Sequence, residues 1–230
     1  MYKFLYVFLS LSLCLSACKT SKIDREKNGQ EKSYLALGDS YTIGESVPEN
    51  KRWPIQLTSA LNEAGFAFSS PKIIAKTGWR TDDLLAAMNK ELDSEKYDLV
   101  SVLIGVNNQY QGKPTEIYRK EFRQILNDAL GFSKTGKNGV FVVSIPDYGV
   151  TPFGKESGKK NISQQIIQYN AIAKKICQEK KIPFYNITPI SLKAETNQAL
   201  VAKDGLHPSG EMYQRWVEEI FPKVKKRITN

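Results

Sequence analysis

The chain has 230 residues, of which 41% are hydrophobic and 25% are charged. These values exclude a chain that is disordered throughout, and they allow one α/β domain or two small ones. Lys and Arg number 33 against 24 Asp and Glu. This excess is spread in pairs such as Lys159-Lys160, and its densest cluster lies at residues 223–227 of an amphipathic helix. We therefore interpret it as solvated surface, with weak affinity for an anionic surface as the alternative, and expect no nucleic-acid partner.

The N-terminus has the layout of a secretory signal. Lys3 is followed by FLYVFLSLSLCLSA, an uncharged run that ends in small residues and is shorter than the roughly 20 apolar residues of a spanning helix. Its end, LSAC at residues 15–18, resembles the lipobox of bacterial lipoproteins. The resemblance implies that residues 1–17 are removed, that Cys18 carries lipid, and that the protein is an exported bacterial lipoprotein held on the periplasmic or cell-surface side of a membrane. An ordinary signal peptide that contains a cysteine is the alternative.

The next segment is polar, and the folded domain follows it. Residues 18–32 carry charges without an apolar period, so we expect the lipidated cysteine and a flexible tether there. Residues 33–230 form the predicted domain. Cys177 would then have no partner for an internal disulfide, and its place in an apolar helical pattern predicts a small buried side chain.

Short apolar runs alternate with helical patterns along the domain. The predicted strands are residues 34–37, 72–75, 99–104, 140–145 and 183–187. The predicted helices are residues 54–65, 81–92, 114–131, 162–180, and a last one carrying Met212, Trp216, Ile220 and Val224. Thr81 is expected to cap the second of these helices. The third is expected to bury a stripe of Ile117, Phe122, Ile125 and Ala129.

This alternation predicts one α/β domain, a three-layer α/β/α sandwich of flavodoxin-like type with a parallel sheet of about five strands. Two connections are long for such a fold, namely residues 146–161 and roughly 190–208. Long loops in compact domains tend to carry function. In open α/β sheets, ligands bind at the carboxyl ends of the strands, where these loops gather.

The sequence contains a single histidine, His207, in the segment KDGLHPSG. Asp204 precedes it by three residues, across a turn that contains Gly205, so its carboxylate can reach the imidazole Nδ1–H. Pro208 favours an extended conformation at His207 and so predicts that the ring is presented on a loop. An aspartate and a histidine on one short turn supply the orienting group and the base of a catalytic triad.

Ser40 follows the first predicted strand, in the segment YLALGDSYTIGES, and is therefore expected at the carboxyl end of a strand. A serine attacks only if a base takes its proton, and His207 is the one imidazole able to do so. The alternative is that Ser40 merely caps a helix. The order Ser, Asp, His is that of the α/β-hydrolases, but their G-x-S-x-G elbow is absent.

Four short blocks together resemble the SGNH, or GDSL-type, hydrolases over essentially residues 34–227. The blocks are GDS at residues 38–40, Gly78 in KTGWRT, Gly105 and Asn107 in LIGVNNQ, and Asp204 with His207. The resemblance implies that Ser40 is the nucleophile, His207 the base and Asp204 its orienting group. It also implies an oxyanion hole made by the Ser40 and Gly78 amides and the Asn107 side chain.

The chain departs from the family in one place, because Asn108 follows Asn107 where the family often has Asp. An asparagine keeps one acceptor and loses the charge, which puts the geometry of that loop in question. Asp39 is expected to support the nucleophile loop through hydrogen bonds. Four loop aromatics either wall a substrate pocket or pack the loops down: Trp79, Tyr110, Tyr148 and Phe153.

We therefore predict a serine esterase that cleaves a carboxylic ester or thioester through an acyl-enzyme, with a small-molecule, lipid or carbohydrate ester as substrate and no cofactor. A metal site is not expected, since one histidine and scattered carboxylates give no ligand cluster. The alternative is a non-catalytic, flavodoxin-like ligand-binding surface lipoprotein. Against a phosphate-binding loop, the segment after the first strand has no lysine and no G-x-G-x-x-G.

Overall fold

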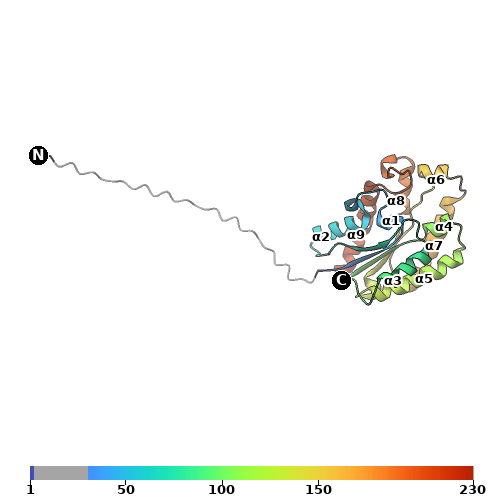
Figure 1. Ribbon diagram of the computed structural model, residues 1–230, viewed down its shortest axis with the longest axis horizontal. Coiled ribbons are helices and arrows are strands. Elements are labelled where there is room, and N and C mark those ends of the chain that lie inside the picture. The colour runs from blue at the N-terminus through green and yellow to red at the C-terminus, as the bar shows by residue number, and fades with distance from the viewer. Residues whose placement is uncertain (3–30, 230) are drawn as a thin grey trace.

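A computed structural model describes residues 1–2 and 31–229 of the chain (Figure 1). Residues 3–17 of the expected signal, the lipidation site Cys18 and most of the expected tether lie outside the described residues. Lys32 already belongs to the domain, because its backbone N–H donates to the Ala67 carbonyl at 2.6 Å. None of the helices in the described part combines the length and the apolar content needed to cross a bilayer.

One sheet of five parallel strands forms the centre of the domain, in the order β2-β1-β3-β4-β5. The strands are β1 (Tyr34–Gly38), β2 (Lys72–Ala75), β3 (Leu99–Leu103), β4 (Val140–Val143) and β5 (Phe184–Tyr185). Every residue of β1, β3 and β4 is buried, as expected for strands covered on both faces. The parallel sheet and its flavodoxin-like strand order confirm the predicted fold class.

Helices pack on both faces of the sheet (Figure 1). The pair α2 (Trp53–Glu63) and α9 (Gly210–Thr229) covers one face. The other face is covered by α3 (Thr81–Glu91), α5 (Thr115–Phe132) and α7 (Ile162–Lys180). The predicted three-layer arrangement is therefore confirmed. The connections that follow β1 and β3 run over opposite faces of the sheet. In such folds this leaves a crevice between the carboxyl ends of the two strands, where loops can form a site.

Short helices occupy the loops at these carboxyl ends. They are α1 (Ser40–Ile43), α4 (Val106–Tyr110), α6 (Pro152–Glu156) and α8 (Thr188–Ser191). Three 3₁₀ turns accompany them, at Glu49–Lys51, Leu192–Glu195 and Gln198–Leu200, and a further one at Gly136–Asn138 directly precedes β4. The two long connections are thus ordered by short helical segments. Because α1 and α4 follow β1 and β3 directly, the residues at their starts are held close to the edge of the sheet.

Two expectations about the helices are wrong. Arg80, not Thr81, is the N-cap of α3, because Arg80 is extended and its N–H donates to the Asp83 carboxylate at 3.0 Å. Ile117 is 43% exposed, whereas Tyr118 is fully buried in its place. The reason is helical geometry: five residues separate Ile117 from Phe122, which puts them on different faces, while Tyr118 lies one turn before Phe122.

Candidate active site

Strand β1 leads directly into the turn that carries Ser40. A side chain at Gly38 would place its Cβ 2.1 Å from the Thr42 hydroxyl and 2.4 Å from the Leu103 carbonyl oxygen. Only glycine therefore allows the chain to turn so tightly from β1 into α1. Ser40 is the first residue of α1 and is buried. Its backbone N–H, like those of every first helical turn, has no partner within the helix.

Asp39 supports this turn as the N-cap of α1. Its Oδ1 accepts a hydrogen bond from the Tyr41 N–H at 3.0 Å. The carboxyl is fully buried, and this burial raises the pKa of Asp39 to about 7, against the opposing effect of N–H groups of Tyr41, Gly105 and Asp39 itself. The expected supporting role of Asp39 thus has a structural basis, and the fold favours its neutral form.

The buried Asp39 carboxyl should make stability depend on pH. Its folded pKa lies above the unfolded value, so the folded state holds the proton more tightly and stability falls as pH rises from about 4 through about 7. We expect Asp39→Asn, which keeps the capping oxygen and loses the charge, to be more stable than the wild type at pH 8 by up to about 4 kcal/mol. Urea titrations at pH 5 and pH 8 measure this. The same difference between the two proteins at both pH values would contradict it.

Asp204 and His207 are joined on the turn that precedes α9. The imidazole Nδ1 lies 2.7 Å from Asp204 Oδ2, and Oδ1 accepts the backbone N–H groups of Leu206 and His207, each at 2.9 Å. Ser46 donates its hydroxyl to Oδ2 at 2.6 Å. Although partial burial raises the pKa of Asp204, the hydrogen bonds from Ser46, Leu206 and His207 lower it to about 2. With each oxygen accepting two hydrogen bonds, the carboxylate stays ionised and fixed in orientation.

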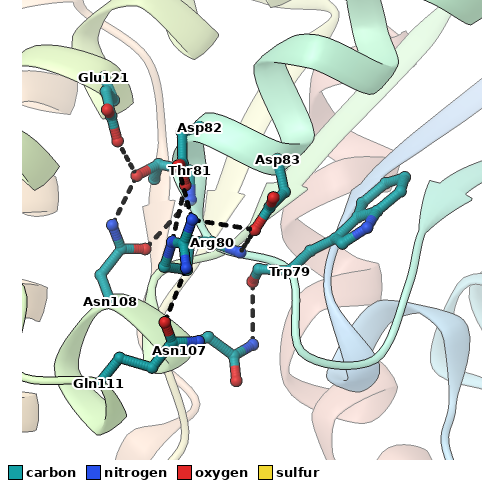
Figure 2. Close-up of polar contacts among 9 residues, drawn as sticks. All are labelled: Trp79, Arg80, Thr81, Asp82, Asp83, Asn107, Asn108, Gln111 and Glu121. Atoms are coloured by element: carbon teal, nitrogen blue, oxygen red, sulfur yellow. Dashed lines mark hydrogen bonds and ion pairs between the residues drawn. The ribbon is translucent and has the colours of Figure 1, made fainter.

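Gly78 and Asn107 follow β2 and β3, the two strands that flank β1 in the sheet. Gly78 has φ of +85°, a conformation that favours glycine. Asn107 donates one N–H of its side-chain amide to the Trp79 carbonyl at 2.9 Å (Figure 2). Because an amide nitrogen carries two N–H groups, this bond fixes the side chain and leaves a second donor.

Asn108 organises the loop behind Asn107. Its side chain is buried and forms two hydrogen bonds with Thr81: Oδ1 accepts from the Thr81 N–H at 3.1 Å, and Nδ2 donates to the Thr81 hydroxyl at 2.7 Å. That hydroxyl in turn donates to the carboxylate of Glu121 (Figure 2). This network needs a hydrogen-bond donor at residue 108, because the Thr81 hydroxyl has a single proton and already gives it to Glu121, and asparagine supplies that donor.

The Asn108 network predicts that aspartate is not tolerated here. Asn108→Asp removes the donor to Thr81 and adds a buried charge near Glu121, so we expect a loss of about 2–3 kcal/mol in unfolding free energy at pH 8. The fold would raise the pKa of the introduced carboxyl, so the loss should shrink toward pH 4, where a proton restores the donor. Thermal unfolding at both pH values measures this, with Asn138→Asp on an exposed turn as the control. Equal melting temperatures for the two variants at pH 8 would contradict the prediction.

Of the predicted site residues, Ser40, Gly78, Asn107 and His207 line one pocket of about 180 Å³, whereas Asp204, Asp39 and Asn108 lie behind this lining. It is lined by Ser40, Tyr41, Thr77, Gly78, Val106, Asn107, Tyr110, Tyr148, Phe153, Leu206 and His207. Of the four loop aromatics, Tyr110, Tyr148 and Phe153 line the pocket. The Trp79 side chain is not among the lining groups. It extends away from Asn107 (Figure 2) and is packed, partly buried, against the hydrophobic core.

Sequence reasoning missed three contributors. Ser46 reaches Asp204 from the loop after α1, and the Thr77 hydroxyl donates to the carboxylate of Glu45 in the same loop. Tyr41 packs its ring edge-on against His207, with 5.7 Å between the ring centroids. Since Ser46 and Asp204 are 158 residues apart, no local pattern could have revealed this contact. In residues 1–2 and 31–229, no group of three His, Cys, Asp or Glu side chains could hold a metal ion.

Comparisons with known proteins relate the chain to a family and to a shared fold. Residues 36–215 match the GDSL-like lipase/acylhydrolase family. An arylesterase from Vibrio mimicus is 27% identical over 216 residues, which cover 92% of each chain. The psychrotrophic esterase EstA from Pseudoalteromonas sp. superposes with a TM-score of 0.66 at 15% identity, covering 87% of this chain and 100% of that one. The lipase/acylhydrolase from Enterococcus faecalis superposes with a TM-score of 0.65 at 19% identity, covering 85% of this chain and 96% of that one. At these identities the two structures show a shared fold.

Proposed function

Because this chain belongs to the GDSL-like lipase/acylhydrolase family and is a hydrolase acting on esters, we propose that it cleaves them through a triad of Ser40, His207 and Asp204. The observation that carries the proposal is the hydrogen bond between Asp204 and His207, since the His207 side chain lines the same pocket as Ser40. Asp204 holds a proton on Nδ1, which leaves Nε2 as the basic nitrogen.

In the first half of the reaction, Ser40 Oγ attacks the ester carbonyl carbon while His207 Nε2 takes its proton. The carbonyl oxygen becomes an oxyanion, for which the Ser40 and Gly78 amides and the Asn107 side chain are the proposed donors. Expulsion of the alcohol, protonated by His207, leaves the acyl group on Ser40. Water then attacks this acyl-enzyme with His207 as the base, and the carboxylic acid leaves as Ser40 regains its proton.

The pocket supports a limited range of substrates. Its small volume and its aromatic walls, Tyr110, Tyr148 and Phe153, suit a short acyl or aryl group of a carboxylic ester or thioester. Acylated carbohydrates and lipids are the proposed natural substrates.

A covalent label tests the nucleophile. The esterase EstA has been crystallised in a form inhibited by monoethylphosphonate, and we expect diethyl p-nitrophenyl phosphate to phosphorylate this protein at Ser40. One equivalent of p-nitrophenolate should be released, and peptide mass spectrometry should place one diethylphosphoryl group on Ser40. Heat-denatured protein is the control, because labelling needs the folded site. No label, together with no turnover of p-nitrophenyl esters from acetyl to long chain, would favour the ligand-binding alternative.

We also propose the lipoprotein form, with residues 1–17 as the signal peptide, Cys18 as the lipidated residue and 18–32 as the tether. Its support is the LSAC segment and the charged, polar stretch after it. Multiple acyl chains on Cys18 would anchor the domain to a membrane, since each buried methylene adds about 0.8 kcal/mol. Cell fractionation of the full chain tests this: Cys18→Ser should move the protein out of the membrane fraction, and a variant that remains there would contradict lipid anchoring.

A further inference from the structure

A second hollow, of about 480 Å³, lies beside the active-site pocket. It is lined by Gln109, Tyr110, Gln111, Gly112, Lys159, Lys160 and Gln165. Tyr110 lines both spaces, so its side chain stands between them. The two linings differ in chemistry: aromatic and aliphatic side chains dominate the active-site pocket, whereas amides and ammonium groups dominate this hollow.

Three acceptors in this hollow are already occupied, and a fourth, the side-chain oxygen of Gln109, is buried out of reach of solvent and has no partner among the described residues. Arg80 donates to Gln111 Oε1 at 2.7 Å (Figure 2), and since arginine can only donate, the Gln111 oxygen must face it. Gln109 Nε2 donates to Gln165 Oε1 at 2.6 Å, and Lys159 Nζ donates to the Tyr110 carbonyl at 2.8 Å.

What remains for a ligand is therefore a set of donors. The side-chain amide nitrogens of Gln111 and Gln165 are directed away from their occupied oxygens, and two ammonium groups accompany them. Lys159 lies over the Tyr110 ring, 4.3 Å from its centroid, which fixes one of these charges at the boundary of the two spaces. None of the lining residues carries a carboxylate. A hollow with positive charge and free donors complements an anion.

We propose that this hollow is a subsite for an anionic group, a carboxylate or a phosphate, carried by the ester substrate. The proposal rests on the function proposed above, because it assigns the substrate class of the same enzyme. The ester occupies the pocket beside Ser40, and the acidic group lies beyond Tyr110 against Lys160 and Gln165. The preferred substrates are thus esters that bear an acidic group on the acyl or the alcohol side.

Matched ester pairs test the subsite. Mono-p-nitrophenyl glutarate against p-nitrophenyl pentanoate places the charge on the acyl side at equal chain length. On the alcohol side, 4-acetoxybenzoate and 4-acetoxyphenyl phosphate are each compared with phenyl acetate, which also separates carboxylate from phosphate. In at least one pair we expect kcat/KM to be about 10-fold higher for the charged ester at low salt, with the ratio falling as salt is added.

Two variants locate the effect. Lys160→Gln removes one charge, and Gln165→Glu keeps the oxygen that accepts from Gln109 while replacing the free donor with a negative charge. We expect the charged-to-neutral ratio to fall about 3-fold in Lys160→Gln and at least 10-fold in Gln165→Glu. Lys226→Gln, at the exposed end of α9, is the control. It changes the net charge by the same amount as Lys160→Gln and should keep the wild-type ratio of charged to neutral ester.

These experiments distinguish a failure of the proposed function from a failure of the anionic subsite. If no neutral ester is hydrolysed, the proposed function is wrong. If neutral esters are hydrolysed but no pair favours the charged ester, the anionic subsite is wrong and the esterase stands. The subsite is equally overturned if Gln165→Glu and Lys226→Gln give the same ratio.

Discussion

Replacing Ser40 with alanine is expected to lower kcat/KM for p-nitrophenyl acetate by at least about 10⁴-fold, toward the uncatalysed rate. Loss of a serine nucleophile removes the covalent route altogether, and such losses reach about 10⁶-fold in serine hydrolases. The residual rate would come from substrate binding and the oxyanion donors alone. Initial rates at saturating and subsaturating ester measure this, with Ser59→Ala on the exposed face of α2 as the matched control.

The Ser40→Ala variant should remain folded. The side chain that caps α1 belongs to Asp39, and the tight contact that shapes the turn belongs to Gly38. We therefore expect the same melting temperature as the wild type within about 2 °C, since a change well below 0.5 kcal/mol shifts it little. Activity within 10-fold of the wild type in this folded variant would show that Ser40 is not the nucleophile.

Asp204→Asn is expected to lower kcat/KM by about 10³–10⁴-fold. In the wild type, Oδ2 lies 2.7 Å from the His207 Nδ1, on which we propose that it holds a proton. An asparagine can turn its amide N–H toward Nδ1 instead, which moves the imidazole proton to Nε2, where the base is needed. Substitutions of this kind keep the geometry and cost about 10⁴ in kcat.

The loss in Asp204→Asn should appear in kcat more than in KM, because the carboxylate acts through His207 and the substrate pocket is lined by other side chains. Since the pKa of Asp204 is about 2, the wild-type group is ionised throughout an assay range of pH 5–9, and the loss should be similar across it. Asp93→Asn, in an exposed loop, is the control. A loss below 10-fold at every pH would show that the Asp204–His207 pair has no part in catalysis.

The sheet was largely predictable from the sequence, because burial on both faces leaves a signature in each strand. The runs at β1, β3 and β4 are almost continuously apolar, and each residue of these strands is buried. Helix ends were less predictable. Thr81 is a common capping residue, yet its hydroxyl is used by Asn108 and Glu121, and Arg80 takes the capping position. A contact made across the fold thus overrides the local preference.

The contacts of the candidate site also differ in how far they could be predicted from the sequence. The Asp204–His207 pairing is local, so a spacing of three residues was enough to predict it. The partner of Asn108 could not be predicted, because the contact with Thr81 depends on how the loops after β2 and β3 pack. Likewise, the hollow beside Tyr110 joins residues of α4 to residues near the start of α7, and only the packed structure brings these lysines and glutamines together.

The order of the site residues along the chain has a consequence for biosynthesis. Ser40, Gly78 and Asn107 follow the three adjacent strands β1, β2 and β3, and are made early. The imidazole comes from residue 207, immediately before α9, which packs on α2 from the first half of the domain. A nascent chain that has emerged only to residue 200 carries the proposed nucleophile but has no histidine at all. The proposed triad is therefore incomplete during translation, and hydrolysis by the proposed route cannot begin until residues 204–207 and the last helix have joined the domain.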